Sequence, residues 1–317
     1  MDWPASAGTV ISRTVTLPTL VWLLLATIWG STWLMIKVGL ADLPPVSFAA
    51  IRFVVASAPL CAWLALRRRP LRYSRADWRL MIVTGLLVFA LNYTLVFWGE
   101  SHISAGLAAI LYTTFPILGM LQAHWLLPAE PLTARKLGGA VVAMVGVAVI
   151  FYSQVDLRGP WALIGSVALV AAAAATAFAD VLIKRSGSHI EPVTMTAVQM
   201  VASLPPMLAL ALIVDGNPLA LPWTPRAVGT LLYLAFVGSS LTFVLLYWLI
   251  QRMQVTRTML IPLFSTVIAV VLDAVILGDR LHWRTLAGGA AVMAGLAFAL
   301  SGRRPPAGSN QTPMARP

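Results

Sequence analysis

Long apolar runs without charged residues are the feature that most restricts what this chain can fold into. Leu20–Ile36, Val193–Val214 and Leu286–Ser301 are nearly continuous examples. About 20 apolar residues are long enough to cross the hydrocarbon core of a bilayer as a helix, whereas a membrane β-barrel shows short segments of alternating polarity. Only 10% of the residues are charged, against about 25% in soluble domains. The sequence therefore predicts an all-α polytopic membrane protein.

Turn-forming residues divide the apolar sequence into ten expected transmembrane helices. The connections are short, as in Asp42-Leu-Pro-Pro and Asp215-Gly-Asn-Pro, so they hold no soluble domain. We expect a cytoplasmic polar leader without a cleavage site over residues 1–18 and a disordered cytoplasmic tail over 302–317. The spans are expected at about 20–39, 47–66, 79–98, 104–127, 134–152, 160–184, 192–214, 226–249, 256–277 and 284–301.

The distribution of Lys and Arg along the chain indicates its orientation. The net charge is +11, but no water-facing basic domain is expected, so nucleic-acid binding is excluded. Sixteen of these residues fall on one side of the ten spans and four on the other, with Lys37 and Arg52 inside the membrane. Because positively charged loops stay in the cytoplasm, we expect a multi-pass protein of a bacterial-type inner membrane with both termini cytoplasmic.

The second half of the chain repeats the first at an offset of 147 to 150 residues. The segment Glu130–Arg135 with its following glycines aligns with Asp279–Arg284, which divides the chain into five-span halves over 19–152 and 153–301. Because five is odd, the second half enters the membrane upside down relative to the first. Inverted repeats of this kind are typical of transporters that work by alternating access, although a duplicated helical bundle without transport activity would show the same pattern.

Several short motifs occur in order along the first half, with counterparts in the second. They are Trp29-Gly-Ser, Pro44-Pro45, Ala50-Ile-Arg52-Phe53, Asn92-Tyr93, Ser104-Ala105 and Glu130-Pro-Leu-Thr with Gly139. Their order, spacing and duplication resemble the EamA-type transporters of the drug/metabolite transporter (DMT) superfamily over about residues 20–301.

The resemblance implies ten helices around a central cavity lined mainly by spans 1, 3, 4, 6, 8 and 9. It also implies a place among bacterial exporters of amino acids and other small metabolites. The chain departs from the family pattern at Ala129, where a glycine is usual, and at Asp279, where a glutamate is usual. The span-9 proline stands at Pro262 rather than near Thr266.

Aromatic, hydroxyl and amide side chains inside the expected spans are the main candidates for a substrate cavity. Such a lining offers apolar area together with orienting hydrogen bonds, which suits small amphipathic solutes. Pro116 and Pro262 interrupt the helical hydrogen bonding of spans 4 and 9, either as gating hinges or as static kinks. The cavity candidates are Trp29, Ser31, Thr32, Trp33, Asn92, Tyr93, Tyr112, Thr113, Tyr247 and Trp248.

Three charged residues within the spans form a second group of candidates, because ionisable side chains in a bilayer usually have a partner or a function. Arg52 resembles the family arginine. It attracts an anionic carboxylate, pairs with a neighbouring helix, or extends toward the outer headgroups as a structural residue. Asp180 lies four residues before Lys184. We therefore expect these two residues to form an ion pair on one helix face, in preference to a proton-carrying Asp180.

These patterns predict a transporter that needs no cofactor. The four histidines are isolated, so no metal site is expected, and no nucleotide-binding motif stands out. The main hypothesis is an exporter of small metabolites, above all amino acids, with a small-molecule substrate and the bilayer as its partners. The alternatives are a carrier for drugs, sugars or nucleoside-like solutes and, less expected, a membrane enzyme. Glycine-rich faces at Gly138-Gly139 and Gly288-Gly289 are interpreted as packing within the bundle or at a homodimer contact.

Overall fold

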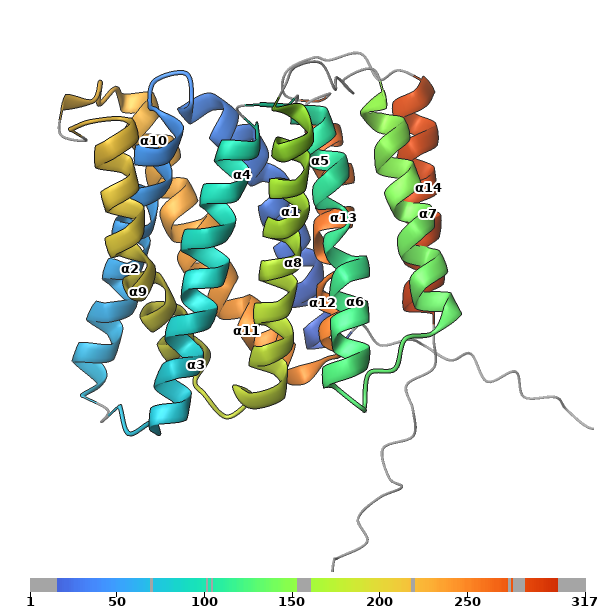
Figure 1. Cartoon of the computed structure of the whole chain (residues 1–317), viewed down its shortest axis with the longest axis horizontal. Coiled ribbons are helices and arrows are strands. Elements are labelled where there is room, and N and C mark those ends of the chain that lie inside the picture. Colours follow the sequence, from blue (N-terminus) through green and yellow to red (C-terminus); the bar gives the residue numbers. More distant parts are fainter. Residues whose placement is uncertain are drawn as a thin grey trace, which may run out of the picture.

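The computed structural model describes residues 16–68, 71–100, 102–103, 105–152, 161–217, 220–272, 275 and 283–301. Within these ranges the chain forms helices and no β-strand, which confirms the all-α class. The helices stand side by side in one bundle, and most of them run between the same two ends of the molecule (Figure 1).

The described residues of the first half form seven α-helices and one π-helix, labelled η1. Local signals begin several of them: Ser74 and Asp77 form a reciprocal capping box, and Thr133 caps a later helix with its hydroxyl, as expected for N-terminal capping residues. The elements are α1 (Leu17–Gly39), α2 (Pro45–Arg67), α3 (Arg75–Gly85), η1 (Leu86–Leu91), α4 (Asn92–Glu100), α5 (Ala105–Tyr112), α6 (Phe115–Leu126) and α7 (Ala134–Ile150).

The second half has a similar series of elements, including a second π-helix, η4. Thr224 caps the third of its helices, at the position equivalent to Ser74 in the first half. The elements are α8 (Ala162–Ser186), α9 (Pro192–Val214), α10 (Pro225–Ala235), η4 (Phe236–Leu241), α11 (Thr242–Arg252), α12 (Val255–Thr258), α13 (Ile261–Leu272) and α14 (Trp283–Leu300).

Seven helical segments of the described chain are long and apolar enough to cross a membrane. The other three expected spans are shorter as single helices. The span expected at 104–127 consists of α5 and α6, the span at 134–152 is the 17-residue α7, and the described part of 256–277 contains α12 and α13. The seven segments are Leu17–Ile36, Pro45–Arg67, Arg75–Val96, Ala162–Ser186, Pro192–Val214, Pro225–Arg252 and Trp283–Leu300.

Pro116 and Pro262 explain where two of the expected spans are broken. Each is the second residue of a new helix, α6 and α13 respectively. Proline lacks a backbone N–H and its ring clashes with the preceding helical turn, so a helix starts more easily at these positions than it continues through them. The role of the two prolines as hinges stays a prediction.

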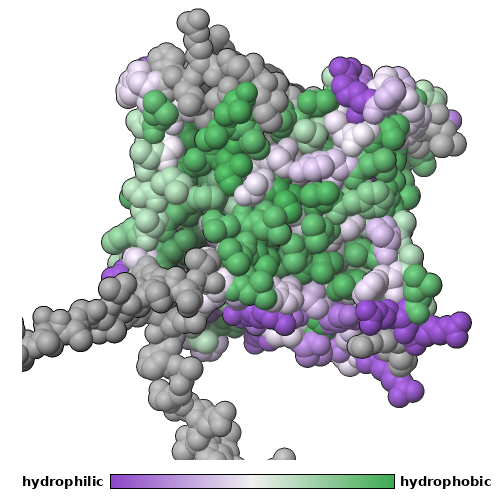
Figure 2. All heavy atoms as spheres, turned by 180° about the vertical axis from the view of Figure 1, so that it is seen from behind, coloured by the Kyte–Doolittle hydropathy of each residue, from purple (hydrophilic) through white to green (hydrophobic). Residues whose placement is uncertain are grey.

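The surface of the bundle carries a broad apolar band. Figure 2 shows this band between the two ends of the molecule, with hydrophilic residues gathered along one end. Large apolar side chains are strongly exposed on the described part of the chain, including Trp125, Leu163 and Ile213. Soluble monomers rarely expose such large apolar patches, so this surface fits a multi-pass membrane protein.

Helices α7 and α14 pack against each other through glycines (Figure 1). A Cβ atom added to Gly139 would lie 2.5 Å from the carbonyl oxygen of Gly295, and one added to Gly146 would lie 2.6 Å from that of Gly288. Gly288 and Gly295 are the repeat equivalents of Gly139 and Gly146, so the contact is reciprocal. These small-residue faces therefore serve packing within the chain.

Candidate functional site

Phe243 is the centre of a cluster of aromatic rings inside the bundle. Its ring centroid lies 6.2 Å from that of Trp29, 4.6 Å from that of Phe89 and 6.2 Å from that of Tyr247. The rings belong to α1, η1 and α11, so elements of both halves meet here. The structure thus connects two predicted cavity residues through two phenylalanines that sequence reasoning did not single out.

Phe53 extends this aromatic cluster to α2 and α4. Its ring makes T-shaped contacts with Phe89, at a centroid distance of 4.9 Å, and with Tyr93, at 5.0 Å. Phe53 is fully buried, whereas the Tyr93 side chain is half-buried. Phe53 was identified only as part of the family motif that contains Arg52. An apolar residue in an apolar span gives no further sequence signal that separates a neighbour of the site from ordinary core.

Asn92 and Tyr112 form a polar pair between α4 and α5. The Tyr112 hydroxyl donates to Oδ1 of Asn92 at 3.0 Å, and the Tyr112 ring lies parallel to that of Phe115 at a centroid distance of 6.2 Å. Thr113 does not join this pair, because its hydroxyl donates to the carbonyl oxygen of Ile110. Two of the predicted residues therefore meet next to the break between α5 and α6.

The hydroxyl groups of α1 are already engaged by protein atoms. Ser31 Oγ donates to the carbonyl oxygen of Ile28 at 2.7 Å, so it accepts its second hydrogen bond, at 2.6 Å, from the Tyr233 hydroxyl of α10. Thr32 Oγ1 donates to the carbonyl oxygen of Trp29 at 2.7 Å. Tyr233 belongs to none of the motifs, and only its place on a neighbouring helix reveals it.

Trp33 and Trp248 are the remaining two tryptophan candidates. The backbone of Trp33 belongs to α1, and its side chain lies outside the described part of the structure. Trp248 lies under the guanidinium carbon of Arg252, which is 4.2 Å from its ring centroid. A tryptophan beside a charged residue at the end of a membrane helix is typical of an interface anchor.

Arg52 is buried in α2 and bonded to the π-helix η4. Its side chain is 6% exposed. Nε donates to Oγ of Ser239 at 2.8 Å, and Nη2 donates to the carbonyl oxygen of Gly238 at 3.0 Å. Within the described residues, no acidic side chain forms an ion pair with it. Because π-helical turns free backbone carbonyls and often mark functional sites, the pairing of this cation with η4 makes Arg52 a strong site candidate.

Gln199, the repeat equivalent of Arg52, makes the corresponding contact beside η1. Its Nε2 donates to Oγ1 of Thr84 at 2.7 Å. A Cβ atom added to Gly85 would lie 2.6 Å from the Cα of Gln199. Thr84 and Gly85 directly precede η1. Each π-helix therefore adjoins a polar residue from the second helix of the other half.

Asp180 and Lys184 do not form the ion pair expected from their spacing. Lys184 Nζ donates to the carbonyl oxygens of Ile250 at 2.6 Å and Met253 at 2.9 Å. The last carbonyls of a helix lack intrahelical partners and attract cations, and α11 presents them to Lys184. Asp180 is only 4% exposed, and no hydrogen bond or ion pair joins its carboxylate to another described residue.

Two contacts join the halves at the end of the bundle that holds the α1–α2 turn. Asp42 accepts hydrogen bonds from Arg226 Nε at 2.8 Å and Thr224 Oγ1 at 2.7 Å. Mainly because of the bond from Arg226, the pKa of Asp42 falls from its ordinary value of 3.8 to about 2. Asp215 accepts a hydrogen bond from the backbone N–H of Ser47 at 2.6 Å.

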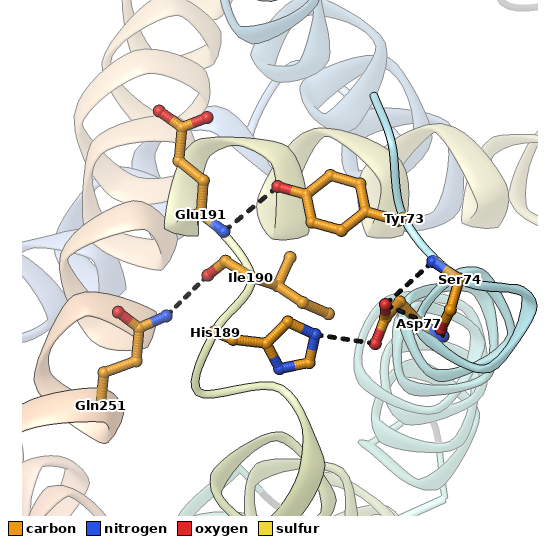
Figure 3. Close-up of polar contacts among 7 residues, drawn as sticks. All are labelled: Tyr73, Ser74, Asp77, His189, Ile190, Glu191 and Gln251. Carbon is orange, nitrogen blue, oxygen red and sulfur yellow. Dashed lines mark hydrogen bonds and ion pairs between the residues drawn. The ribbon is translucent and has the colours of Figure 1, made fainter. Parts of the chain in front are cut away.

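At the opposite end, the loop between α8 and α9 is held from two sides (Figure 3). His189 Nε2 lies 2.9 Å from Oδ1 of Asp77 in the first turn of α3. Gln251 Nε2 of α11 donates to the carbonyl oxygen of Ile190 at 2.7 Å. His189 is the repeat equivalent of Asp42, and Asp77 and Arg226 both lie in the first turn of equivalent helices, α3 and α10. Each end of the bundle therefore has a similar polar contact.

Glu130 makes a further connection between the halves at this second end. It is 3% exposed and accepts hydrogen bonds from the backbone N–H groups of Val255 at 2.8 Å and Thr256 at 3.1 Å. The Thr256 hydroxyl donates a third at 3.0 Å. The carboxylate therefore satisfies the first donors of α12, and it ties the α6–α7 turn to the second half.

The donor set of the site suits organic solutes. It consists of phenols, amides, hydroxyls, one guanidinium and one carboxylate. The described part of the chain contains no group of three or more His, Cys, Asp or Glu side chains placed to hold a metal ion.

The sequence matches a known family model over most of its length. The model, described as the EamA-like transporter family, matches residues 17–152 and 163–301. The chain also resembles a solved crystal structure with a TM-score of 0.75 at 18% identity, over 89% of this chain and 96% of the other. At that identity the likeness concerns the fold.

Several curated proteins align along much of their length. The "Uncharacterized transporter YoaV" of Bacillus subtilis is 27% identical over 242 residues, which are 76% of this chain and 82% of that protein. The "Probable amino-acid metabolite efflux pump" of Salmonella typhimurium is 28% identical over 291 residues, which are 89% of this chain and 94% of that protein. A protein of the same name from Escherichia coli is 26% identical over 290 residues, with the same coverage of 89% and 94%.

Proposed function

Because the chain belongs to the EamA-like transporter family, we propose that it exports small metabolites, with amino acids, aromatic ones included, as the substrate class. The observation that carries this assignment is Arg52, a buried guanidinium that no acidic side chain of the described chain neutralises. Tyr93 lies within its electrostatic range, beside the aromatic cluster. A guanidinium recognises a carboxylate, and aromatic rings offer apolar surface to the rest of the solute.

The proposed architecture is ten transmembrane helices in two inverted halves, 19–152 and 153–301. Reciprocal contacts support it. The glycines of α7 and α14 exchange partners between the halves, and Arg52 and Gln199 each bond next to the π-helix region of the opposite half. A two-fold relation makes residue i contact the equivalent of j while j contacts the equivalent of i, as these pairs do.

Alternating access is the proposed mechanism, since inverted halves can exchange conformations around one central site. The contacts at the two ends of the bundle, Asp42 with Arg226 and Asp77 with His189, each connect the halves. Opening one end breaks its contact while the other stays closed. The breaks at Pro116 and Pro262 give the two halves short segments that can bend during this exchange.

We assign the protein to a bacterial-type inner membrane with both termini in the cytoplasm. The apolar band and the seven candidate spans support the membrane location. The charge bias of sixteen Lys and Arg residues against four supports the orientation, because positively charged loops are retained in the cytoplasm.

Efflux of other amphipathic solutes, such as drugs, sugars or nucleoside-like compounds, is the second candidate function. The aromatic cluster around Phe243 favours it, since ring surfaces bind apolar groups without selecting for a carboxylate. The family and the names of its relatives indicate a transporter rather than an enzyme.

Metabolite profiling of bacteria that overexpress the chain tests the proposal. We expect particular amino acids to rise outside the cell relative to an empty-vector strain, and we expect Arg52→Gln and Tyr93→Ala to reduce the rise several-fold at matched membrane levels. An unchanged amino-acid profile with normal protein levels would overturn the assignment. A rise confined to solutes without a carboxylate would establish the second candidate instead.

A further inference from the structure

Asp180 is a buried carboxylate without a protein partner. Its side chain is 4% exposed, and no hydrogen bond or ion pair connects it to the described residues. Lys184, the cation one turn away on α8, uses its ammonium group on the carbonyl oxygens of Ile250 and Met253. Burial disfavours the ionised form of a carboxyl group that has no partner, so a cationic partner from outside the protein would stabilise the charge of Asp180.

Other incompletely bonded polar atoms share the surroundings of Asp180. Thr176 precedes it by one helical turn on the same face of α8. The Thr176 hydroxyl is buried beside that of Tyr112, and it makes no hydrogen bond of full geometry. The Tyr247 hydroxyl of α11 is buried beside the Gln199 amide, and neither it nor Gln199 Oε1 makes a hydrogen bond of full geometry. Tyr247 and Tyr112 both lie within the electrostatic range of Asp180. Buried polar groups in native proteins normally have partners, so this group of incompletely bonded oxygens indicates that something other than the protein completes it.

The chemistry of these oxygens specifies the missing partner. A carboxylate only accepts hydrogen bonds, and hydroxyl groups can accept them too. A primary ammonium carries three N–H donors and one positive charge, so it can satisfy the carboxylate and two hydroxyls at once. Aromatic faces nearby add cation–π attraction for the same group.

We propose that Asp180, with the hydroxyls of Thr176 and Tyr247, binds the ammonium group of the transported solute. The proposal rests on the proposed export of amino acids, and it names the recognition of the amino group within that function. Arg52 does not form part of this subsite. Its electrostatic neighbour is Tyr93, and Tyr93 in turn neighbours Tyr112 and Tyr247. Tyrosines therefore lie near both the carboxylate of Asp180 and the guanidinium of Arg52.

Three ligands with a similar phenyl-alkyl skeleton but different charged groups distinguish recognition by Asp180 from recognition by Arg52. Phenylalanine carries both charges, phenethylamine lacks the carboxylate, and 3-phenylpropionate lacks the ammonium. Each is titrated at pH 7 as a competitor of radiolabelled phenylalanine on the purified full chain in nanodiscs. Asp180→Asn should lower the affinity for phenylalanine and for phenethylamine by about tenfold or more, as expected for loss of a charged hydrogen-bond acceptor. The affinity for 3-phenylpropionate should stay within twofold of wild type.

Two further variants serve as controls for the effect of Asp180→Asn. Glu191→Gln removes an exposed carboxylate at the start of α9 and should change none of the three affinities. Asp180→Glu keeps the charge and should retain most of the preference for phenethylamine over 3-phenylpropionate, which also covers the case in which Asp180→Asn does not fold.

Three outcomes would overturn the ammonium subsite. One is an equal loss of all three ligands in Asp180→Asn. Another is unchanged binding of phenethylamine by this variant. The third is unchanged binding of every ligand together with loss of pH-driven substrate accumulation, which would make Asp180 a proton carrier. None of these three outcomes contradicts the proposed export of amino acids. In contrast, a wild-type protein that binds none of the three ligands would contradict the proposed function itself.

Discussion

Arg226 donates a hydrogen bond from Nε to the carboxylate of Asp42 at 2.8 Å, and this contact joins the α1–α2 turn of the first half to the start of α10 in the second. At the opposite end, His189 in the α8–α9 turn is the equivalent of Asp42, and its Nε2 lies 2.9 Å from Oδ1 of Asp77 in the first turn of α3. The acidic residue thus changes from the α1–α2 turn to the first turn of α3 while the geometry is kept. Two similar contacts, one at each end of the bundle, suit an alternating mechanism, in which one end opens while the other stays closed.

The contact between Asp42 and Arg226 should be insensitive to pH in the physiological range. The folded-state pKa of Asp42, about 2, lies below its ordinary value of 3.8. Its contribution to stability is therefore fully present above the unfolded-state pKa and is lost as the pH falls through the folded-state pKa. We expect the difference in Tm between wild type and Asp42→Asn in detergent to be constant from about pH 5 to pH 8 and to shrink below about pH 4. A difference that varied between pH 5 and pH 8 would contradict this.

Breaking the two end contacts should shift the conformational equilibrium in opposite directions. Asp42→Asn should favour the state open at the outer end, and Asp77→Asn the state open at the inner end. Ion pairs that water can screen contribute little to stability, so each shift should be at most about fivefold. The measurement is labelling of Ser31→Cys by an impermeant thiol reagent from either side, in a Cys61→Ser background. Shifts in the same direction would contradict the alternating mechanism.

Some local features of the fold could be predicted from the sequence because their cause is local. Pro116 and Pro262 mark helix starts since proline chemistry acts on its own turn. The π-helices could not be predicted in the same way. Their widened turns adjoin residues that lie more than 100 positions away in the sequence, Arg52 beside η4 and Gln199 beside η1. A change of helical register that depends on such a distant partner leaves no local pattern in the sequence.

The contacts of the candidate site also depend on residues that are distant in the sequence. The spacing of Asp180 and Lys184 favours a helical ion pair, but it carries no information about the carbonyls of α11 that bind Lys184 instead. Ser31 and Tyr112 were identified as polar residues in apolar spans. Their partners Tyr233 and Asn92 are set by helix packing, so the sequence identifies candidate groups better than it identifies pairs.

The close approach of α7 and α14 should make Gly139 intolerant of even a methyl group. The added Cβ would lie 2.5 Å from a backbone carbonyl oxygen, which cannot move without shifting a helix. We expect Gly139→Ala to lower the free energy of unfolding by about 1–3 kcal/mol. Gly289→Ala is the matched control, because nothing lies within 4 Å of its added Cβ, and it should be neutral or slightly stabilising. Similar effects of the two variants on detergent unfolding would contradict the packing argument.

Glu130 should be required for both the stability and the transport activity of the chain. Its buried carboxylate accepts hydrogen bonds from two backbone N–H groups and one hydroxyl of Val255 and Thr256. Glu130→Gln turns an N–H₂ group toward donors and leaves at least one buried donor without an acceptor. This should cost about 1–3 kcal/mol, measured by unfolding in detergent, and export should fall because α12 loses its anchor to the first half. Glu191→Gln, an exposed carboxylate, should change stability by less than about 0.5 kcal/mol. Unaltered stability of Glu130→Gln would mean that α12 is held by packing alone.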